Sequence, residues 1–530
     1  MFSEHSESAD LRWDAPGPGL WMGEFSHFPR PVTATMELLW RRLSSGAMHA
    51  ECERYGLPID FFEFRAVNGW LYSTPVAVPP VERSEREAAA IRVAEQRTWL
   101  ADATNWLGRE RAEWIARNDS FRAVDLELLD DGAVADHLEQ ILEHVVRAAV
   151  RHMELHLADM IPTGRLLAAT RAVGVDDRIV VAALAGTSPA SRPDPALEQL
   201  AVLAREHEID LAAVDDLSAL GDDASGLVVD YLERRGWETA SRWDVDAPTI
   251  NELPGAILAS VRRLAGRRES APSVDRGTLD ELPVDRELVE DALTTFGLRD
   301  DNVAILGSCP VGLARRAMLE AGRRLASTAR LPQPDLALEA TPDELATMLR
   351  GRSATHVDEL AERRRRRRAA WDADPPPLIG GEDPSLLDGA GPTSIALFDA
   401  LGIYGGLMDA PPSPPMSGLG IGERTVVGRA VVAHSPDDAA SELDAGDILV
   451  TFATSPGFDH LLAAAGAVVT VTGGLLSHAA VFARESGLTA VLGVAEATTM
   501  IRTGDEVIVD PSVGTVTVAA ANRRRHVSCT

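Results

Sequence analysis

The chain has 530 residues, a length that predicts several domains with enough core to fold independently. Its formal net charge is -30, from 81 acidic and 51 basic residues, so no general affinity for nucleic acid or anionic membranes, which are polyanions, is expected. No window is apolar enough to predict a membrane span, and the polar, acidic N-terminus does not resemble a signal peptide.

The cysteine and lysine content of the chain limits which disulfides, metal sites and cationic phosphate clamps it can form. The cysteines, Cys52, Cys309 and Cys529, are far apart and in no metal-binding spacing. We therefore expect no disulfide framework and no bound metal, and a reducing cytoplasm as the location. None of the 51 basic residues is a lysine, so a cationic clamp for phosphate would have to use arginine. The sequence also contains no Walker-type loop and no dinucleotide-binding fingerprint.

The N-terminal part begins with little regular structure. Residues 1–12 are expected to be a disordered lead-in, and residues 13–21 are rich in Pro and Gly. An extended segment at 26–33 precedes a helix expected at 34–43. Residues 61–72 alternate around Asn68-Gly69, a dipeptide that predicts a β-hairpin.

Residues from about 84 to 350 have a helical sequence pattern, because apolar residues recur every three or four positions. This pattern predicts a mostly helical, substrate-binding domain over residues 13–370. Its helices are expected at 84–116, 133–158, 194–206, 226–235, 252–265, 285–295, 312–326 and 342–350.

Six consecutive arginines at 363–368 allow two interpretations: an anion-binding patch, or the solvated end of a helix, which we favour. Residues 371–420 carry Pro and Gly runs around one short apolar stretch near 395–407. They are expected to form a semi-rigid linker with a small helix in it.

The pattern becomes β/α over residues 421–521, ahead of a basic tail at 522–530. Strands are expected at 425–433, 447–453, 467–471, 490–493, 506–509 and 515–518, and helices at about 456–465 and 479–486. The fold class is therefore α+β and multidomain, with a large helical part followed by a smaller β/α domain.

The stretch 468–487 carries the most specific chemical signal. A β-branched run ends at Gly473 and Gly474, and Ser477 and His478 follow just before a helix. Glycines allow close backbone approach to a ligand, and a helix N-terminus favours anions. His478 is placed to carry a phosphoryl group, Ser477 to cap the helix or bond a phosphate oxygen, and Arg484 to reach an anion. For a lone histidine, capping or core filling would be the better interpretation.

The motif Thr472-Gly473-Gly474…Ser477-His478-Ala479-Ala480…Ala483-Arg484-Glu485…Gly487 resembles the phosphohistidine ("mobile") domain of phosphoenolpyruvate-utilising enzymes. This resemblance implies a swivelling β/β/α domain over about 420–520, whose histidine shuttles a phosphoryl group between two distant sites.

A weaker resemblance to the same family covers part of the helical region. Residues 28–33, ending at Thr33, are similar to the start of a helical substrate-binding domain, and residues 316–349 are similar to its end. Arg299-Asp300 resembles an Arg–acid pair that faces the phosphate, although the family's nearby lysine has no counterpart here.

Histidines supply the other acceptor-side candidates. His27 is expected in a pocket or in a packed aromatic corner. His152 and His156 lie one helical turn apart, in a helix that also carries His137 and His144, and form either a polar substrate pocket or a solvated face. A zinc site is disfavoured, because Met153 stands where the zinc-protease motif needs Glu.

The resemblance implies a phosphotransferase that acts on a small-molecule acceptor. Neither the ATP-grasp domain that opens the family's enzymes nor a phosphoenolpyruvate-binding barrel is recognised here, so a separate ATP-grasp partner is the expected donor, supplying Mg²⁺ and ATP. Two alternatives stay open. His478 could act as a general acid or base in an ATP-independent elimination or condensation, or the chain could be a non-catalytic subunit.

Overall fold

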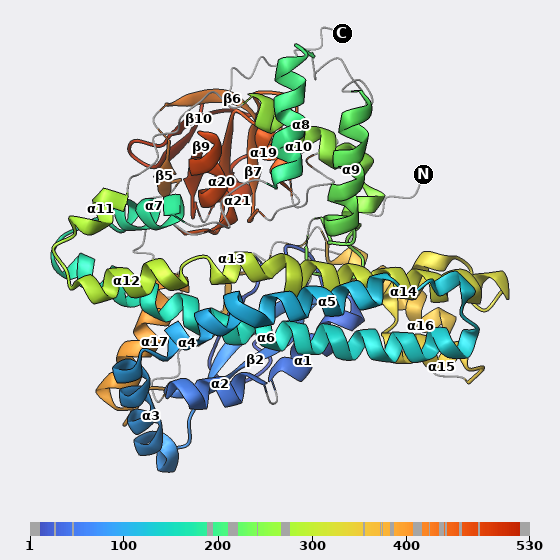
Figure 1. Cartoon of the computed structure of the whole chain (residues 1–530), viewed down its shortest axis with the longest axis horizontal. Helices are drawn as coiled ribbons and strands as arrows, with labels where there is room; N and C mark the ends of the chain where they lie inside the picture. The colour runs from blue at the N-terminus through green and yellow to red at the C-terminus, as the bar shows by residue number, and fades with distance from the viewer. Residues whose placement is uncertain are drawn as a thin grey trace, which may run out of the picture.

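The computed structural model of the chain describes most residues between 11 and 519 (Figure 1). The described residues are 11–25, 28–44, 47–187, 194–209, 221–240, 242–266, 276–352, 356–371, 373, 375–381, 386–405, 416–422, 424–433, 439, 442–454, 458–474, 477–494 and 496–519. Some side chains within these ranges, those of Arg299 and His478 among them, are not described. None of the described helices combines the length and the apolar character that a bilayer crossing requires.

An antiparallel four-stranded sheet forms near the N-terminus, in the order β2-β3-β1-β4. Its strands are β1 (Leu20–Gly23), β2 (Ile59–Val67), β3 (Trp70–Ala77) and β4 (Leu378–Gly380). The predicted hairpin is confirmed: Asn68 and Gly69 join β2 to β3 with φ of 51° and 82°, the positive values that a type I′ turn requires. The Pro/Gly-rich segment, in contrast, enters strand β1 at Leu20, because β3 and β4 supply its hydrogen-bonding partners.

Most of the remaining body is helical. Its α-helices are α1 (Ala34–Ser44), α2 (Ala47–Tyr55), α3 (Arg83–Gln96), α4 (Thr98–Asn105), α5 (Arg111–Arg122), α6 (Asp131–Ala172), α7 (Asp177–Thr187), α8 (Pro195–Glu206), α9 (Asp222–Arg235), α10 (Pro254–Gly266), α11 (Arg276–Asp280), α12 (Arg286–Thr295), α13 (Leu298–Asn302), α14 (Cys309–Ser327), α15 (Pro342–Leu349), α16 (Val357–Ala369) and α17 (Pro392–Gly405). Two π-helical turns, η3 (Trp106–Glu110) and η9 (Val303–Ser308), and the 3₁₀ turns η2 (Pro80–Glu82), η4 (Leu126–Leu128), η8 (Ile250–Glu252) and η10 (Pro334–Glu339) complete it.

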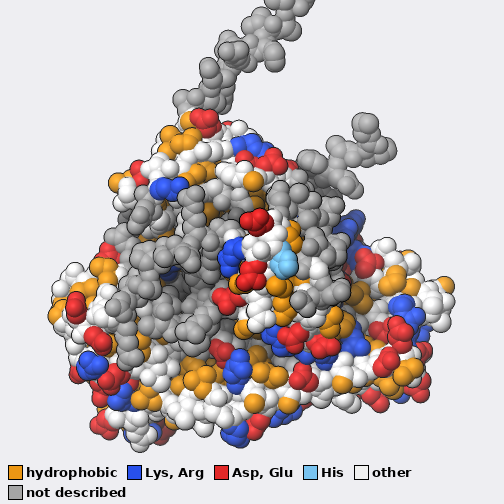
Figure 2. Space-filling view, turned by 45° about the horizontal axis from the view of Figure 1, so that its top comes forward, with side chains coloured by type: hydrophobic (Ala, Val, Ile, Leu, Met, Phe, Trp, Pro, Cys, Tyr) orange, Lys and Arg blue, Asp and Glu red, His pale blue; other side chains and the backbone are white. Residues whose placement is uncertain are grey.

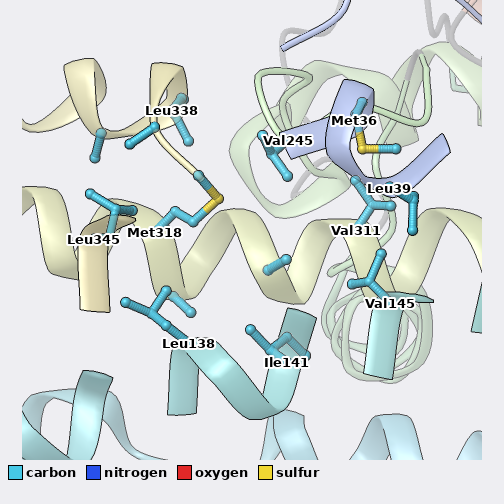
Figure 3. Close-up of a cluster of buried hydrophobic side chains, with 14 of the residues drawn as sticks. Met36, Leu39, Leu138, Ile141, Val145, Val245, Val311, Met318, Leu338 and Leu345 are labelled. Atoms are coloured by element: carbon cyan, nitrogen blue, oxygen red, sulfur yellow. The ribbon is translucent and has the colours of Figure 1, made fainter. Parts of the chain in front are cut away.

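Helix α6 is the axis of this body and packs against α12, α14, α15 and α17. Figure 3 shows Leu138, Ile141 and Val145 of α6 facing Val311 and Met318 of α14 in the largest buried cluster. The expected helix at 133–158 is therefore too short. The helix runs on through Pro162, whose missing N–H breaks only one bond of a 42-residue helix with buried neighbours on several sides.

The helix expected at 84–116 is interrupted at Arg97, which takes a left-handed φ of 51° between α3 and α4. Its guanidinium bonds the buried Asp291 of α12, which also accepts a hydrogen bond of 3.0 Å from Trp99. A tertiary ion pair thus overrides the local helical pattern.

The arginine run is only in part a solvated helix end. It lies on α16, where Arg365 and Arg366 are exposed but Arg367 is only 9% exposed and bonds Glu339 and Asp246. The segment 371–420 likewise is not simply a linker. It contributes β4 to the N-terminal sheet and α17 to the core, where a Cβ on Gly164 of α6 would lie 1.8 Å from the Ala400 carbonyl oxygen.

The C-terminal part is a seven-stranded mixed sheet in the order β11-β10-β6-β7-β8-β9-β5. Its strands are β5 (Leu419–Ile421), β6 (Val426–Val432), β7 (Ile448–Thr451), β8 (Ala467–Thr470), β9 (Thr489–Leu492), β10 (Glu506–Asp510) and β11 (Thr515–Val518), and its helices are α19 (Asp459–Ala464), α20 (His478–Ser486) and α21 (Ala497–Met500). Strands β6 to β9 are parallel, and alternate residues face α19 and α20 or the opposite face of the sheet. The predicted helical part followed by a β/α domain is confirmed.

Candidate functional site

The glycine turn before α20 has a backbone that only glycine adopts easily. Strand β8 continues as an extended segment in which the Thr472 N–H donates to the Phe452 carbonyl at 2.9 Å. Gly473 follows with a φ of +131°, and a Cβ there would lie 3.0 Å from the Ser477 hydroxyl oxygen. Among the described atoms, a Cβ on Gly474 would meet nothing within 4 Å. The turn therefore depends on Gly473 more than on Gly474.

Ser477 caps α20, because its hydroxyl oxygen accepts a hydrogen bond of 3.3 Å from the Ala480 N–H. His478 is consequently the first residue of the helix, where backbone N–H groups lack intrahelical acceptors and the helix dipole favours an anion. A hydroxyl that accepts one bond keeps its own hydrogen as a donor, so Ser477 remains able to bond a phosphate oxygen.

Arg484 lies on the same helix, and its side chain is partly buried. Burial lowers the pKa of its guanidinium to about 10, which still leaves it cationic at neutral pH. The charge needed to attract a phosphoryl group is thus present on the helix that begins at His478.

The turn lies beside a contact between the C-terminal sheet and the N-terminal body. The Phe452 ring packs edge-on against Phe25, with ring centroids 4.8 Å apart, and Phe25 packs in the same way on Trp70 and Tyr72 at 5.4 Å. The carbonyl of Phe452 is the group that holds Thr472. Helix α19 also packs against α10, and Figure 1 shows the sheet seated over the helical body. The glycine turn therefore adjoins the body.

On the body side, Thr33 is tied to the loop between α9 and α10. Its N–H and its hydroxyl both donate to the Asp244 carboxylate, at 2.9 and 2.6 Å. Burial raises the pKa of Asp244, and the neighbouring Asp246 raises it further. Burial opposes the ionisation of Asp246 too, but Arg242 and Arg367 outweigh it and lower its pKa.

The residue before Asp244 is Trp243, which reaches the histidines of α6. The centroids of the Trp243 and His152 rings are 4.5 Å apart. The His152 ring also contacts the ring of His156, with centroids 4.3 Å apart. His152 Nδ1 bonds the side-chain oxygen of Asn302, the last residue of α13. His137, His144 and His152 are all buried, so the solvated-face interpretation is wrong for these three, whereas His156 is half-buried.

Only some of the predicted substrate-binding residues lie close together in the structure. Thr33, His152 and His156 are linked through Asp244 and Trp243, and α13, which holds Asn302, also contains Arg299. The side chain of Arg299 is not described, and His27 lies outside the described residues. Asp244, Trp243 and Asn302 were missed from the sequence. The two tryptophans and three acids of the non-periodic stretch 237–246 were the available signal.

Among the residues that the structure describes, no three imidazole, thiol or carboxylate groups gather closely enough to hold a metal ion.

Comparison with known proteins places the turn in a family. Residues 443–514 match the family described as "PEP-utilising enzyme, mobile domain". Rifampicin phosphotransferase from Streptomyces sviceus is 30% identical over 329 residues, covering 58% of this chain and 36% of that protein. Phosphoenolpyruvate synthase from Aeropyrum pernix is 42% identical over 93 residues, covering 18% of this chain and 11% of that protein.

The first of these matches reaches well beyond the C-terminal domain, since it covers more than half of this chain. The chain nevertheless spans only about a third of the length of the rifampicin phosphotransferases it matches. The matched segment, residues 443–514, includes the glycine turn, Ser477 and His478. Residues 443–514 therefore carry the mobile domain of the phosphoenolpyruvate-utilising enzymes.

Proposed function

We propose that this chain is a phosphotransferase component that passes a phosphoryl group through His478 to a small-molecule acceptor. The observation that carries the proposal is the position of His478 as the first residue of α20, behind the Gly473 turn and the Ser477 cap. An imidazole at a helix N-terminus combines a nucleophile that is partly neutral at pH 7 with backbone donors for phosphoryl oxygens. The rifampicin phosphotransferase and phosphoenolpyruvate synthase relatives support this reaction class.

The bound phosphoryl group would be stabilised by the chain's own groups. The first-turn N–H groups and the Ser477 hydroxyl donate to its oxygens, and Arg484 supplies positive charge on the same helix. The body then supplies the acceptor site, in the region where Thr33, Trp243 and His152 are linked.

Loading of His478 is tested without a protein donor. Potassium phosphoramidate, which phosphorylates imidazole chemically, is expected to place an acid-labile phosphate on His478 of the full chain, located by mass spectrometry. The label is expected to disappear in His478→Ala and to remain in His460→Gln, a matched control in α19 of the same domain. Absence of phosphate from His478, with label on other histidines only, would refute the carrier role.

The donor is expected to be Mg²⁺-ATP processed on a separate ATP-grasp protein. Incubation of the chain with Mg²⁺ and γ-labelled ATP is expected to label His478 only when a candidate ATP-grasp subunit is added. Label acquired from ATP by the purified chain alone would show that no such partner is needed.

A further inference from the structure

Thr470, the last residue of β8, has a hydroxyl group that the surrounding fold leaves unused. Its side chain is 0% exposed, and among the described residues its Oγ1 has no hydrogen-bond partner. Burying a hydroxyl without a partner disfavours folding, so proteins carry few such groups, and each one suggests a role beyond packing. Thr470 stands three residues before Gly473, at the start of the turn that leads to His478.

Neighbouring threonines show that this edge of the sheet can provide acceptors for hydroxyl groups. Thr451 is the register partner of Thr470 on β7, and its hydroxyl donates to the Ala453 carbonyl at 3.4 Å. The hydroxyl of Thr472, two residues further along the chain, donates to the Phe452 carbonyl at 3.2 Å. The Thr470 hydroxyl differs from both, because it has no acceptor among the described residues.

The Thr470 side chain lies on the face of the sheet that α20 covers. Successive side chains of a strand point to opposite faces. Val468 packs in one buried cluster with Ala480 and Ala483 of α20, whereas Val469 belongs to the cluster on the other face. Thr470 follows Val468 by two residues and therefore shares its face, beneath the helix that begins at His478.

The Thr470 hydroxyl also borders the glycine turn. A Cβ on Gly473 would lie 3.3 Å from Thr470 Oγ1 and 3.0 Å from the Ser477 hydroxyl oxygen, so the two hydroxyls flank the space that this glycine leaves free. Ser477 accepts its bond from the Ala480 N–H and keeps its own hydrogen to donate. The first-turn N–H groups of the nine-residue helix α20 add further donors. Donors thus gather at the start of α20, an arrangement that binds anions.

We propose that Thr470 binds the phosphoryl group carried by His478, with its hydroxyl donating to a phosphoryl oxygen beside Ser477. The inference rests on the proposed carrier role of His478. Thr470 takes part in no covalent step. Before loading, its hydroxyl is a buried donor without an acceptor, and the phosphoryl group supplies that acceptor as a charge-assisted hydrogen bond. Thr470 therefore favours the phosphorylated state over the unloaded one.

The test compares the full chain before and after loading with potassium phosphoramidate at pH 8. Amide hydrogen exchange, read by mass spectrometry on peptides from β8 and α20, measures how often the turn opens. Loading is expected to slow this exchange in the wild type. In Thr470→Val, which keeps the shape and removes the hydroxyl, the slowing is expected to be about tenfold smaller, as for the loss of one charge-assisted hydrogen bond. Thr470→Ser is expected to retain the full effect.

Thr451→Val is the matched control, because it makes the same change at the register partner, whose hydroxyl already has an acceptor. It is expected to speed exchange before loading and to keep the full response to loading. Thr470→Val is instead expected to exchange no faster than the wild type before loading, since it removes a hydroxyl without a partner.

Three outcomes would overturn the inference while leaving the carrier role intact. One is a Thr470→Val chain that loads and responds to loading as the wild type does. Another is faster exchange of unloaded Thr470→Val, equal to that of Thr451→Val, which would mean that the hydroxyl is already bonded. The third is equal, Thr470-dependent slowing of the unloaded chain by inorganic phosphate, which would indicate a site for a free anion. A wild type that does not load His478 would overturn the proposed function and this inference together.

Discussion

At the level of single residues, Gly473 has the backbone conformation on which the turn before Ser477 and His478 depends. Its φ of +131° lies in a region that residues with a side chain rarely adopt, and its missing Cβ leaves room for the Ser477 hydroxyl. Its neighbour Gly474 has open space where a Cβ would stand, among the described atoms. The two glycines, equivalent in the motif, are unequal in the structure.

Gly473→Ala is therefore expected to destabilise the C-terminal domain by about 1–3 kcal/mol and to reduce phosphoramidate loading of His478 at least tenfold. Gly474→Ala is the matched control and is expected to leave the unfolding free energy within about 0.5 kcal/mol. Urea unfolding followed by circular dichroism and mass spectrometry of the label measure both effects. Equal effects of the two substitutions would contradict the assignment of the strained position to Gly473.

At the level of elements, α6 is held to α5 and η9 by a buried polar bridge. His144 Nε2 donates to the Asn118 side-chain oxygen at 2.7 Å, and the Asn118 amide donates to the Ile305 carbonyl at 2.8 Å. Phe121 stacks on the His144 ring at 4.7 Å. The bridge joins three elements that are far apart in the sequence, and it holds His144 as a structural, neutral imidazole.

This bridge predicts a loss of stability in mild acid. Burial, together with Arg117 and Arg147, lowers the pKa of folded His144 to about 4, from an ordinary value of 6.5. Because the unfolded chain gains a proton below about pH 6.5 while the folded chain stays neutral, stability contributed at neutral pH is lost as the pH falls towards 4. The loss is on the order of 3 kcal/mol.

His144→Gln removes the titrating group, and the slope of unfolding free energy against pH between about 6.5 and 4 is expected to flatten, although stability at pH 7 also falls. Urea unfolding at several pH values measures this slope. An unchanged slope would show that His144 titrates normally in the folded protein.

Helix α16 shows how an element's environment changes the role of its residues. Its six arginines are indistinguishable in the sequence, yet Arg367 is buried between Glu339 and Asp246 while Arg366 is 79% exposed. On the face shown in Figure 2, acidic and arginine side chains are interspersed, and the described atoms form no continuous basic patch there. The run serves at least in part to anchor α16 to the body.

At the level of the whole molecule, the mobile domain is docked on the N-terminal sheet through aromatic rings. Phe452 and Phe25 are 9% and 1% exposed, and the Phe452 carbonyl supports the backbone of the glycine turn. In the proposed carrier role, His478 would serve two sites, and the domain would leave this contact and return to it. Phe452 takes part both in the docking contact and in the support of the glycine turn.

Phe452→Ala is expected to weaken docking, because truncating a buried phenylalanine removes about 3–5 kcal/mol of packing. Small-angle X-ray scattering should show a larger radius of gyration, with unchanged helical content by circular dichroism. Val513→Ala, at a position 67% exposed in the same domain, is the control. Scattering identical to that of the wild type would mean that other contacts, such as α10 with α19, hold the domain in place.

Local sequence patterns predicted much of this fold, because turns and helices depend mainly on residues that are close together in the chain. The hairpin at Asn68-Gly69, most of the helices and the strands β6 to β11 follow from turn chemistry and apolar periodicity. The break at Arg97 and the strand β4 did not follow, since each depends on a partner far away, Asp291 for the first and β1 for the second. The motif around His478 was equally readable, because a glycine turn and a helix cap are local.

The sequence by itself determined the mobile-domain motif, with His478 as its candidate carrier, and the order of a helical part before a β/α domain, because each follows from contiguous residues. Only the tertiary structure decided which helical residues meet. Thr33, Trp243, His152 and Asn302 come from four separate stretches, and no spacing in the sequence relates them. Their convergence arises from packing around α6, where burial and the hydrogen bond to Asn302 hold the His152 ring in place.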